Sequence, residues 1–314
     1  MIQVNTKKIE RKTIIDKAVK GLFMAIAIMC AMIIVMIAIF IIVKGLSPFI
    51  KKYNINGSYY RVSVSKFIFN NTWYRGPNIY GVGFIVLNTF YVTILSLLIA
   101  VPISVLTALF IAKIAPRKIS IILNAVIELL ASIPSVIYGL FGVGVITRMV
   151  DGLANIFGLQ TAGGQSTLSA VLVLAIMIIP TITMVSITSI KAVKNDLING
   201  SLALGASKMQ TNFKVVLVSA KSGIFSGIIL GVGRALGEAT AVSMVCGNAI
   251  SGPNFSLFGT TRVLTSTMLL GLHESSGLDY DIRFSVGVVL ILIILITNLG
   301  LNMLKNRIGN ANGK

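Results

Sequence analysis

Residues 21–43 read GLFMAIAIMCAMIIVMIAIFIIV, and this stretch contains no charged residue. A helix that crosses the hydrocarbon core of a bilayer needs roughly 20 apolar residues at about 1.5 Å each. The apolar core of a secretory signal peptide is shorter, about 7–15 residues, and a small-residue cleavage site follows it. This stretch is longer and is not followed by such a site. Residues 21–43 are therefore predicted to be a retained first transmembrane helix.

The rest of the chain has the same apolar character. Of its 314 residues, 55% are hydrophobic and only 11% are charged, which is typical of integral membrane proteins and excludes an ordinary soluble domain. We expect an all-α integral membrane protein with six transmembrane helices. Their predicted ranges are 21–43, 83–112, 119–147, 167–190, 222–248 and 284–304. Pro102, Pro134 and Pro180 fall inside these ranges, where we expect them to kink the helices and not to end them.

The distribution of lysine and arginine predicts the orientation. With six spans both termini lie on one side, and the basic residues are more numerous on that side, so both termini are expected in the cytoplasm. The net charge of +18 is then mainly a topology signal. We expect no nucleic-acid partner, because the basic residues are scattered over loops.

The predicted organisation follows from these spans. In chain order it consists of a cytoplasmic N-terminal arm at 1–20, the first transmembrane helix at 21–43, an extracytoplasmic segment at 44–82, a core of five transmembrane helices at 83–308 with a cytoplasmic loop at 191–221, and a C-terminal tail at 309–314.

The extracytoplasmic part contains an exception to the charge bias. Residues 44–75 include basic side chains and no acidic ones. The basic residues are Lys44, Lys51, Lys52, Arg61, Lys66 and Arg75. This segment is either an ordinary solvated loop or an electropositive surface for an anion or an anion-delivering partner.

The few residues that commonly bind metals give no pattern for a metal site. Cys30 and Cys246 both fall in apolar stretches, and His273 has no cysteine or histidine nearby. We expect His273 to be an ordinary surface residue and the chain to hold no metal.

The loop between the fourth and fifth spans has a pattern of its own. Leu-Ala-Leu-Gly-Ala at 202–206 suits a short helix followed by a turn at Gly205, which glycine favours. Two short helices joined at this glycine would form a rigid knob on the inner face. The alternative is an amphipathic connector lying in the membrane interface.

The fifth span contains two charged residues at membrane depth. Residues 231–248 read GVGRALGEATAVSMVCGN, so Arg234 and Glu238 lie inside an otherwise apolar stretch. A charge at this depth costs at least a few kcal/mol, which places both side chains toward a bundle interior or a water-filled path. They are four residues apart, and on a continuous helix they would share a face and pair. An arginine here suits the passage of an oxyanion, whereas the alternative is a purely structural ion pair.

Two further features of the spans bear on packing and on the path. Gly223, Gly227 and Gly231 recur every four residues, which predicts a close approach of another helix. Glu128 is the other acidic residue within the spans. It either lines the same path or bonds to a neighbouring helix as a packing contact.

Residues 199–218, in the loop between the fourth and fifth spans, resemble the coupling loop of ABC-importer permeases. The pattern of that loop is Glu-Ala-Ala, three residues, glycine and then an apolar-x-Leu-Pro ending. The glycine is Gly205, flanked by Leu204 and Ala206. Asn199 replaces the glutamate, Gly200 and Ser201 replace the alanines, and Val218 replaces the proline. The resemblance implies that this loop inserts into a groove on a separate ATPase and relays its closure.

The run Gly-x-Gly-Arg-Ala-Leu-Gly-Glu at 231–238 resembles the signature of phosphate ABC-importer permeases. The segments 239–248 and 128–139, together with Trp73 and Tyr80-Gly81, are similar to the PstC type, and the resemblance extends over residues 20–308. It implies a type I ABC-importer permease fold, translocation roles for Arg234 and Glu238, and transport by alternating access. It also implies a bacterial cytoplasmic membrane location among lipid.

The resemblance implies partners as well. These are a second permease of the PstA type, an ATPase homodimer and an extracytoplasmic phosphate-binding protein. The chain lacks the P-loop pattern Gly-x-x-x-x-Gly-Lys-Ser/Thr, so we expect ATP and Mg²⁺ on the partner subunits, no cofactor on this chain and no enzymatic activity of its own. Two alternatives stay open: another oxyanion as cargo, such as molybdate, sulfate or phosphonate, and a stand-alone carrier or channel.

Overall fold

The computed structural model describes residues 6–310, except residues 56 and 77, and consists mostly of helices. Residues 1–5 of the predicted arm and 311–314 of the predicted tail lie outside the described residues. The α-helices are α1 (Thr6–Ile50), α2 (Val64–Phe69), α3 (Gly83–Leu109), α4 (Arg117–Ser132), α5 (Ser135–Phe141), α6 (Thr147–Ile156), α7 (Thr167–Lys191), α8 (Asn195–Ala203), α9 (Lys208–Thr211), α10 (Leu217–Gly237), α11 (Thr240–Val245), α12 (Leu264–Leu269) and α13 (Gly277–Asn310).

Short irregular elements complete the chain. π-Helical turns occur at Phe110–Ile114, Gly142–Ile146 and Asn212–Val216, and a 3₁₀ turn at Leu272–Glu274. Two small antiparallel hairpins pair β1 (Tyr53–Ile55) with β2 (Ser58–Tyr60), and β3 (Trp73–Tyr74) with β4 (Ile79–Tyr80). Both hairpins belong to the segment between the first two spans.

Six helical segments within the described residues are long and apolar enough to cross a membrane. They are Asp16–Ile50, Gly83–Ile114, Ser135–Ile156, Thr167–Lys191, Lys208–Gly237 and Gly277–Arg307. The predicted number of spans is confirmed, and the second and fourth spans lie close to their predicted ranges. The first and sixth are longer than predicted.

The third predicted span, 119–147, is wrong because Pro134 ends a helix. α4 stops at Ser132, Ile133 is extended with ψ 127°, and α5 starts again after Pro134. Proline lacks an N–H, and its ring disfavours the helical conformation of the preceding residue. The span therefore begins at Ser135, while Pro102 and Pro180 lie inside α3 and α7.

The fifth predicted span, 222–248, is also wrong at both ends. The apolar helix starts earlier, at Lys208, and α10 ends at Gly237. Glu238 leaves the helical conformation with ψ 118°, and the short helix α11 follows. Arg234 therefore lies in the last turn of α10, and Glu238 lies beyond it.

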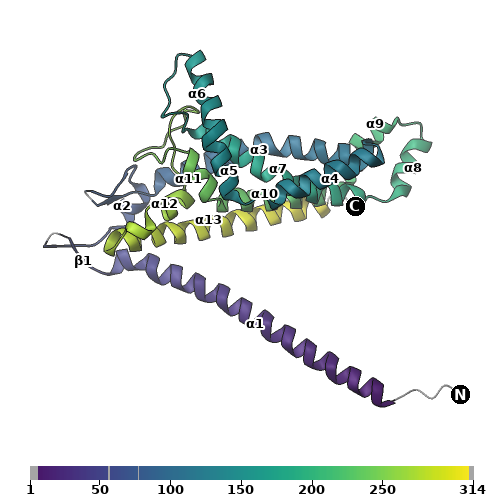
Figure 1. The fold of residues 1–314 in the computed structure, drawn as a ribbon, viewed down its shortest axis with the longest axis horizontal. Coiled ribbons are helices and arrows are strands. Elements are labelled where there is room, and N and C mark those ends of the chain that lie inside the picture. Colours follow the sequence, from purple (N-terminus) through teal and green to yellow (C-terminus); the bar gives the residue numbers. More distant parts are fainter. Residues whose placement is uncertain (1–5, 56, 77, 311–314) are drawn as a thin grey trace.

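α7 is the central helix of the bundle and the most buried of the six spans (Figure 1). α3 is tied to it by hydroxyl groups that donate to carbonyls across the contact. Ser96 Oγ lies 3.1 Å from Val171 O, and Ser104 Oγ lies 3.2 Å from Ile179 O. Such bonds satisfy polar groups that lipid cannot. The largest hydrophobic cluster surrounds α7 with residues of α3, α5, α10 and α11.

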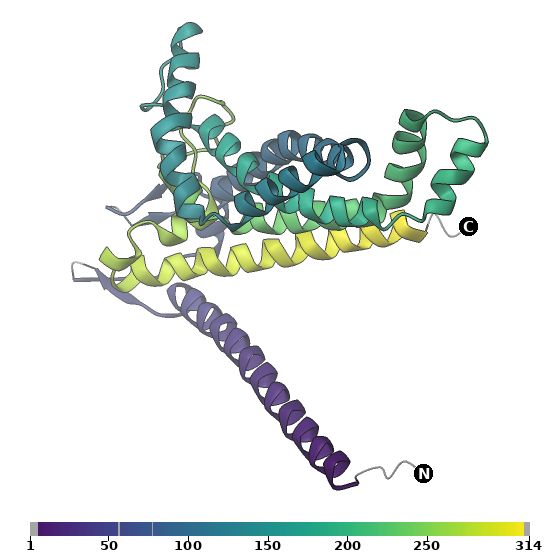
Figure 2. The ribbon, with the colours of Figure 1, turned by 45° about the vertical axis from the view of Figure 1, so that its right-hand side comes forward.

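α1 leaves the bundle at one end and diverges from it along its length (Figures 1 and 2). It packs on α13 only near its C-terminal end. There Ser285 Oγ donates to Gly45 O at 2.6 Å, and the rings of Phe40 and Phe284 meet edge to face at 5.6 Å between centroids. From Asp16 to Met36 the side chains are exposed.

The molecule has two distinct ends. α8 and α9 project from one end, and the start of α1 and the end of α13 lie toward it (Figure 1). The hairpins, α2 and α12 lie at the other end, over a second hydrophobic cluster that includes Phe67, Trp73, Phe84 and Ile282. We call these the α8 end and the hairpin end.

Candidate functional site

Arg234 is placed by the contact between α10 and α7. Gly223, Gly227 and Gly231 all face α7, where Ser189, Val185 and Ile182 occupy the space of the missing side chains. A Cβ on Gly231 would lie only 2.7 Å from Ile182 Cγ1. The glycine stripe therefore lets α10 approach α7 closely. Arg234 follows one turn later and donates from Nη1 to Thr181 Oγ1 at 2.6 Å.

Glu238 does not pair with Arg234, which corrects the prediction of a shared helix face. Because α10 ends at Gly237, the Glu238 side chain turns to α11 and accepts from the backbone N–H of Ala241 at 2.9 Å. Its own carbonyl accepts from Thr265 Oγ1 at 2.6 Å. A carboxylate at the start of a helix is a favourable capping arrangement. In this structure Glu238 stabilises the break between α10 and α11.

Arg234 has no carboxylate partner among the described residues. Among the described residues, the ion pairs join Lys44 to Asp281, and Arg75 and Arg283 to Asp279. Arg234 is partly exposed and bonds to one neutral hydroxyl. A guanidinium has five N–H donors in a planar fork that matches an oxyanion. The arrangement therefore offers free donors to an anion in the membrane region.

One face of α7 extends the polar surface from Arg234 toward the α8 end. Thr181, Met184, Thr188 and Lys191 are spaced by three, four and three residues and so share a face, and all four are at least partly exposed. Thr181 and Thr188 are about 10 Å apart at 1.5 Å per residue. We call this face the α7 polar face.

Glu128 lies at the far end of the α7 polar face. It is exposed on α4 and lines a hollow of about 320 Å³ together with Asn124, Thr188 and Lys191. The structure thus brings Glu128 to the same face as Arg234, about two helical turns away, but not into contact with it. No ion pair of Glu128 occurs within the described part of the chain.

The loop at the α8 end forms a compact knob. α8 ends at Ala203, and the chain turns at Gly205, whose φ of +83° favours glycine. Ala206 N donates to Ser201 O and Gly205 N to Leu202 O, which is the Schellman pattern of helix ends. Ser207 then starts α9 with a capping box to Gln210.

The tip of this knob is apolar and open. Leu204, next to Gly205, is 91% exposed, and Asn199 and Gly200 are exposed on α8. Ser201 is tied to α9 by a 3.0 Å contact between its hydroxyl and that of Thr211. A rigid knob with an exposed leucine is a surface suited to docking.

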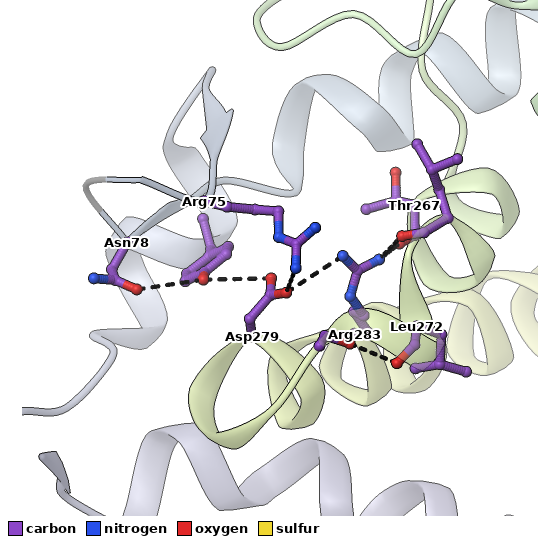
Figure 3. Close-up of polar contacts among 9 residues, drawn as sticks. Arg75, Asn78, Thr267, Leu272, Asp279 and Arg283 are labelled. Carbon is purple, nitrogen blue, oxygen red and sulfur yellow. Dashed lines mark hydrogen bonds and ion pairs between the residues drawn. The ribbon is translucent and has the colours of Figure 1, made fainter. Parts of the chain in front are cut away.

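The hairpin end holds a polar network that the sequence did not indicate (Figure 3). The Asp279 carboxylate forms ion pairs with Arg75 Nη2 at 2.7 Å and with Arg283 Nη2 at 3.5 Å. The Tyr80 hydroxyl donates a hydrogen bond to the same carboxylate at 3.4 Å. Burial, and then the Asp279 charge, raises the pKa of Tyr80, which keeps it a neutral donor. Arg75 and Tyr80 are about 200 residues from Asp279, so no local pattern could reveal these two contacts, whereas Arg283 follows Asp279 by four residues on α13.

The family comparison covers the core of the chain. Residues 100–310 match the family described as binding-protein-dependent transport system inner membrane component. A Bacillus subtilis protein, described as probable ABC transporter permease protein YqgH, is 36% identical over 287 residues, which is 88% of each chain. The phosphate transport system permease protein PstC of Pasteurella multocida is 35% identical, over 72% of this chain and 75% of its own.

Solved structures show the same fold at low sequence identity. A bacterial ABC transporter involved in the import of alginate matches with a TM-score of 0.61 at 17% identity, over 93% of this chain and 98% of that chain. The MetNI methionine ABC transporter in an inward-facing conformation matches with a TM-score of 0.51 at 20% identity, over 73% and 94%. These likenesses confirm the predicted all-α fold of a type I ABC-importer permease. The chain belongs to the family of binding-protein-dependent transport system inner membrane components.

Proposed function

We propose that this chain is a permease subunit of an ATP-driven importer of inorganic phosphate. The observation that carries the proposal is Arg234, a guanidinium in a membrane helix that bonds to Thr181 and has no carboxylate partner among the described residues. A charge in a membrane helix is costly unless a partner or a water-filled cavity stabilises it, and such residues commonly mark substrate pathways. The PstC proteins that are about one third identical to this chain are phosphate permeases, which supports phosphate as the cargo.

The translocation path follows the α7 polar face and is shared with a second permease of the PstA type. This face is open in the single chain, which supports its contact with a partner or with a water-filled path. Arg234 binds the phosphate oxygens weakly during transit, so that release stays fast. Glu238 acts indirectly by fixing the break that places Arg234 at the end of α10. Glu128 lines the inner part of the same path.

The knob at the α8 end couples the chain to an ATPase homodimer. Leu204, Gly205 and Ala206 form its tip, and Asn199, Gly200 and Ser201 form the adjoining face of α8. ATP and Mg²⁺ bind to the ATPase subunits, and this chain itself binds no cofactor. Closure of the ATPases pushes on the knob and favours the outward-open arrangement, and the anion leaves inward after hydrolysis.

The proposed function also implies an orientation in the membrane. The α8 end and both termini face the cytoplasm, and the hairpin end faces outward, where a phosphate-binding protein delivers the anion. The excess of lysine and arginine on the side of the termini supports this orientation. The location is the bacterial cytoplasmic membrane.

Uptake of labelled phosphate tests the function directly. Cells that lack their own phosphate importer would express this chain with its ATPase, second permease and binding protein. We expect uptake that depends on this chain and is unaffected by excess molybdate, sulfate or phosphonate. Inhibition by one of these anions would reassign the cargo, and uptake without the ATPase would indicate a stand-alone carrier.

A single substitution at the knob tests the coupling. Leu204→Ala removes an apolar side chain that packs on nothing in this chain, so folding should not change. Burying a leucine at an interface contributes about 1.5–3 kcal/mol, so we expect at least tenfold weaker binding of the ATPase. Leu159→Ala, an exposed leucine after α6, serves as the control. Equal ATPase binding by both variants would show that the knob is not the docking site.

A further inference from the structure

A second hollow lies at the hairpin end and is lined by three arginines. Its volume is about 380 Å³, and Arg75, Arg262 and Arg283 contribute to its wall together with Glu274. The arginines come from the β3–β4 turn, the loop before α12, and α13. Three cations from separate parts of the chain therefore meet at one concave surface.

Two of these arginines are buried and fixed by backbone carbonyls. Arg262 is 8% exposed and donates from Nε to Ala249 O at 2.6 Å and from Nη2 to Asn248 O at 2.8 Å. Arg283 is 2% exposed and donates from Nη1 to the carbonyls of Thr267 and Leu270. Both guanidiniums are thus held rigidly where they line the hollow.

These bonds leave donors unused. Arg283 Nε is buried and has no hydrogen-bond partner. Arg262 Nη1 makes no hydrogen bond to another described residue. A buried N–H without an acceptor costs about 1–3 kcal/mol, so an acceptor supplied from outside the chain would be favourable.

Arg75 completes the wall at its rim. It and Arg283 approach the same carboxylate, Asp279, from two sides (Figure 3). Gly271 lies beneath both: a Cβ there would be 3.3 Å from Arg75 Nη1 and 3.6 Å from Arg283 Nη2. The missing side chain leaves the guanidinium ends open toward the hollow.

The local charge is positive. Three arginines face two carboxylates, Asp279 and Glu274, and Glu274 is exposed. Burial, with a smaller contribution from the nearby Arg283 charge, lowers the pKa of Arg262 to about 10, so it remains protonated at neutral pH. Cations destabilised by burial and by one another are stabilised by an anion.

We propose that this hollow binds a small tetrahedral oxyanion, inorganic phosphate, at a site separate from Arg234. Two of the three guanidiniums are too deeply buried for a large partner surface to reach, which favours a small anion over an acidic protein side chain. That the bound anion is on its way to Arg234 rests on the proposed function, whereas the binding itself does not.

Phosphorus-31 line broadening of inorganic phosphate tests the site. The full chain in detergent is titrated with phosphate at constant ionic strength, and phosphate in empty detergent micelles serves as the blank. We expect saturable broadening. Arg75→Gln at the accessible rim should weaken the affinity about tenfold, because a charge-assisted bond is lost. Glu274→Gln should strengthen the affinity, because it removes the exposed negative charge.

Two control variants separate phosphate binding in this hollow from binding elsewhere on the chain. Arg61→Gln removes an exposed arginine of the same segment that does not line the hollow, and should leave the affinity and the thermal unfolding unchanged. Arg234→Ala, which removes the proposed transit contact, should lower the broadening only slightly and leave the opposite effects of Arg75→Gln and Glu274→Gln in place. A purely structural role for Arg75 would not give opposite effects at Arg75 and Glu274.

Each contrary outcome has a definite meaning. No broadening above the detergent blank, or broadening lost in Arg234→Ala and unaffected by Arg75→Gln and Glu274→Gln, would overturn the inference. If Arg75→Gln lowered uptake only in the presence of the binding protein and left phosphate binding intact, the hollow would be a partner contact and the inference would also fail. Binding with the expected variant pattern, but no phosphate uptake in cells, would overturn the proposed function and leave this site standing.

Discussion

Arg234 and Arg283 both lie in membrane-spanning helices, but their side chains are held to very different extents. Arg283 is 3% exposed at its side chain, and two carbonyls and Asp279 accept its hydrogen bonds. Arg234 is partly exposed and bonds to the hydroxyl of Thr181. The comparison indicates that an arginine held by several acceptors of its own chain maintains the fold, whereas one held by a single hydroxyl keeps most of its donors for a ligand.

The largest effect should follow the loss of Arg283. Arg283→Met keeps most of the side-chain volume but leaves the carbonyls of Thr267 and Leu270 and part of the Asp279 charge without a partner. Removing one member of a buried ion pair costs about 3–5 kcal/mol. We expect a clearly lower thermal unfolding midpoint in detergent. Arg148→Met, at an exposed arginine, should keep the wild-type midpoint, and equal midpoints for both variants would break the comparison.

The next largest effect is expected at Arg234, and on transport instead of stability. Arg234→Ala removes two possible charge-assisted bonds to phosphate, so labelled uptake should fall about a hundredfold or more. The unfolding midpoint should stay close to that of the wild type. Arg234→Lys keeps the charge without the fork and should recover part of the uptake. Retained uptake in Arg234→Ala would remove Arg234 from the path.

Thr181→Val sharpens the comparison by removing the described partner of Arg234. The shape is kept and one hydrogen bond of about 1 kcal/mol is lost, so uptake should fall roughly fivefold. In an Arg234→Ala background the same change should have no further effect, because the bond is already absent. Additive losses in the double variant would show that Thr181 acts independently of Arg234.

The smallest effect concerns the helix contact that positions Arg234. A Cβ on Gly227 would lie 3.1 Å from Val185 Cβ and 3.3 Å from Ile182 O, whereas nothing lies within 4 Å of one on Gly233. Gly227→Ala should cost about 1 kcal/mol and lower uptake slightly. Gly233→Ala should be neutral or stabilising, because alanine favours helix. Identical unfolding midpoints for the two variants would show that α10 can move away from α7 to accommodate the added methyl group without loss of stability.

The apolar spans and the glycine stripe could be predicted because both are local patterns. A run of about 20 apolar residues has few alternatives to a membrane helix. The four-residue spacing of Gly223, Gly227 and Gly231 places them on one helix face, and such a face allows close packing against whichever helix lies next to it. The number of spans and the all-α class followed from these patterns, whereas the type I importer fold was implied by the family resemblance. The Schellman turn at Gly205 also agrees with the helix–glycine–helix prediction from the sequence.

The breaks in the third and fifth spans could not be predicted in the same way. A proline within a membrane helix either kinks or ends it, depending on whether neighbours satisfy the freed backbone groups, and Pro134 ends it while Pro180 does not. Glu238 leaves α10 where Thr265, 27 residues later, donates to its carbonyl. The pairing of Arg234 with Glu238 was wrong for this reason, since helical spacing applies only within a continuous helix.

The contact between α1 and α13 has a consequence for biogenesis. Ser285 and Gly45 are 240 residues apart, so the first helix of the chain packs on the last. At about 5–20 residues per second, synthesis of the intervening chain takes roughly 12–48 seconds. During that time the first helix must wait in the bilayer without its partner. Residues 21–43 carry no charge, so the first helix is stable in lipid without a helix partner. Packing of the first helix on the last is therefore a late step that follows membrane insertion.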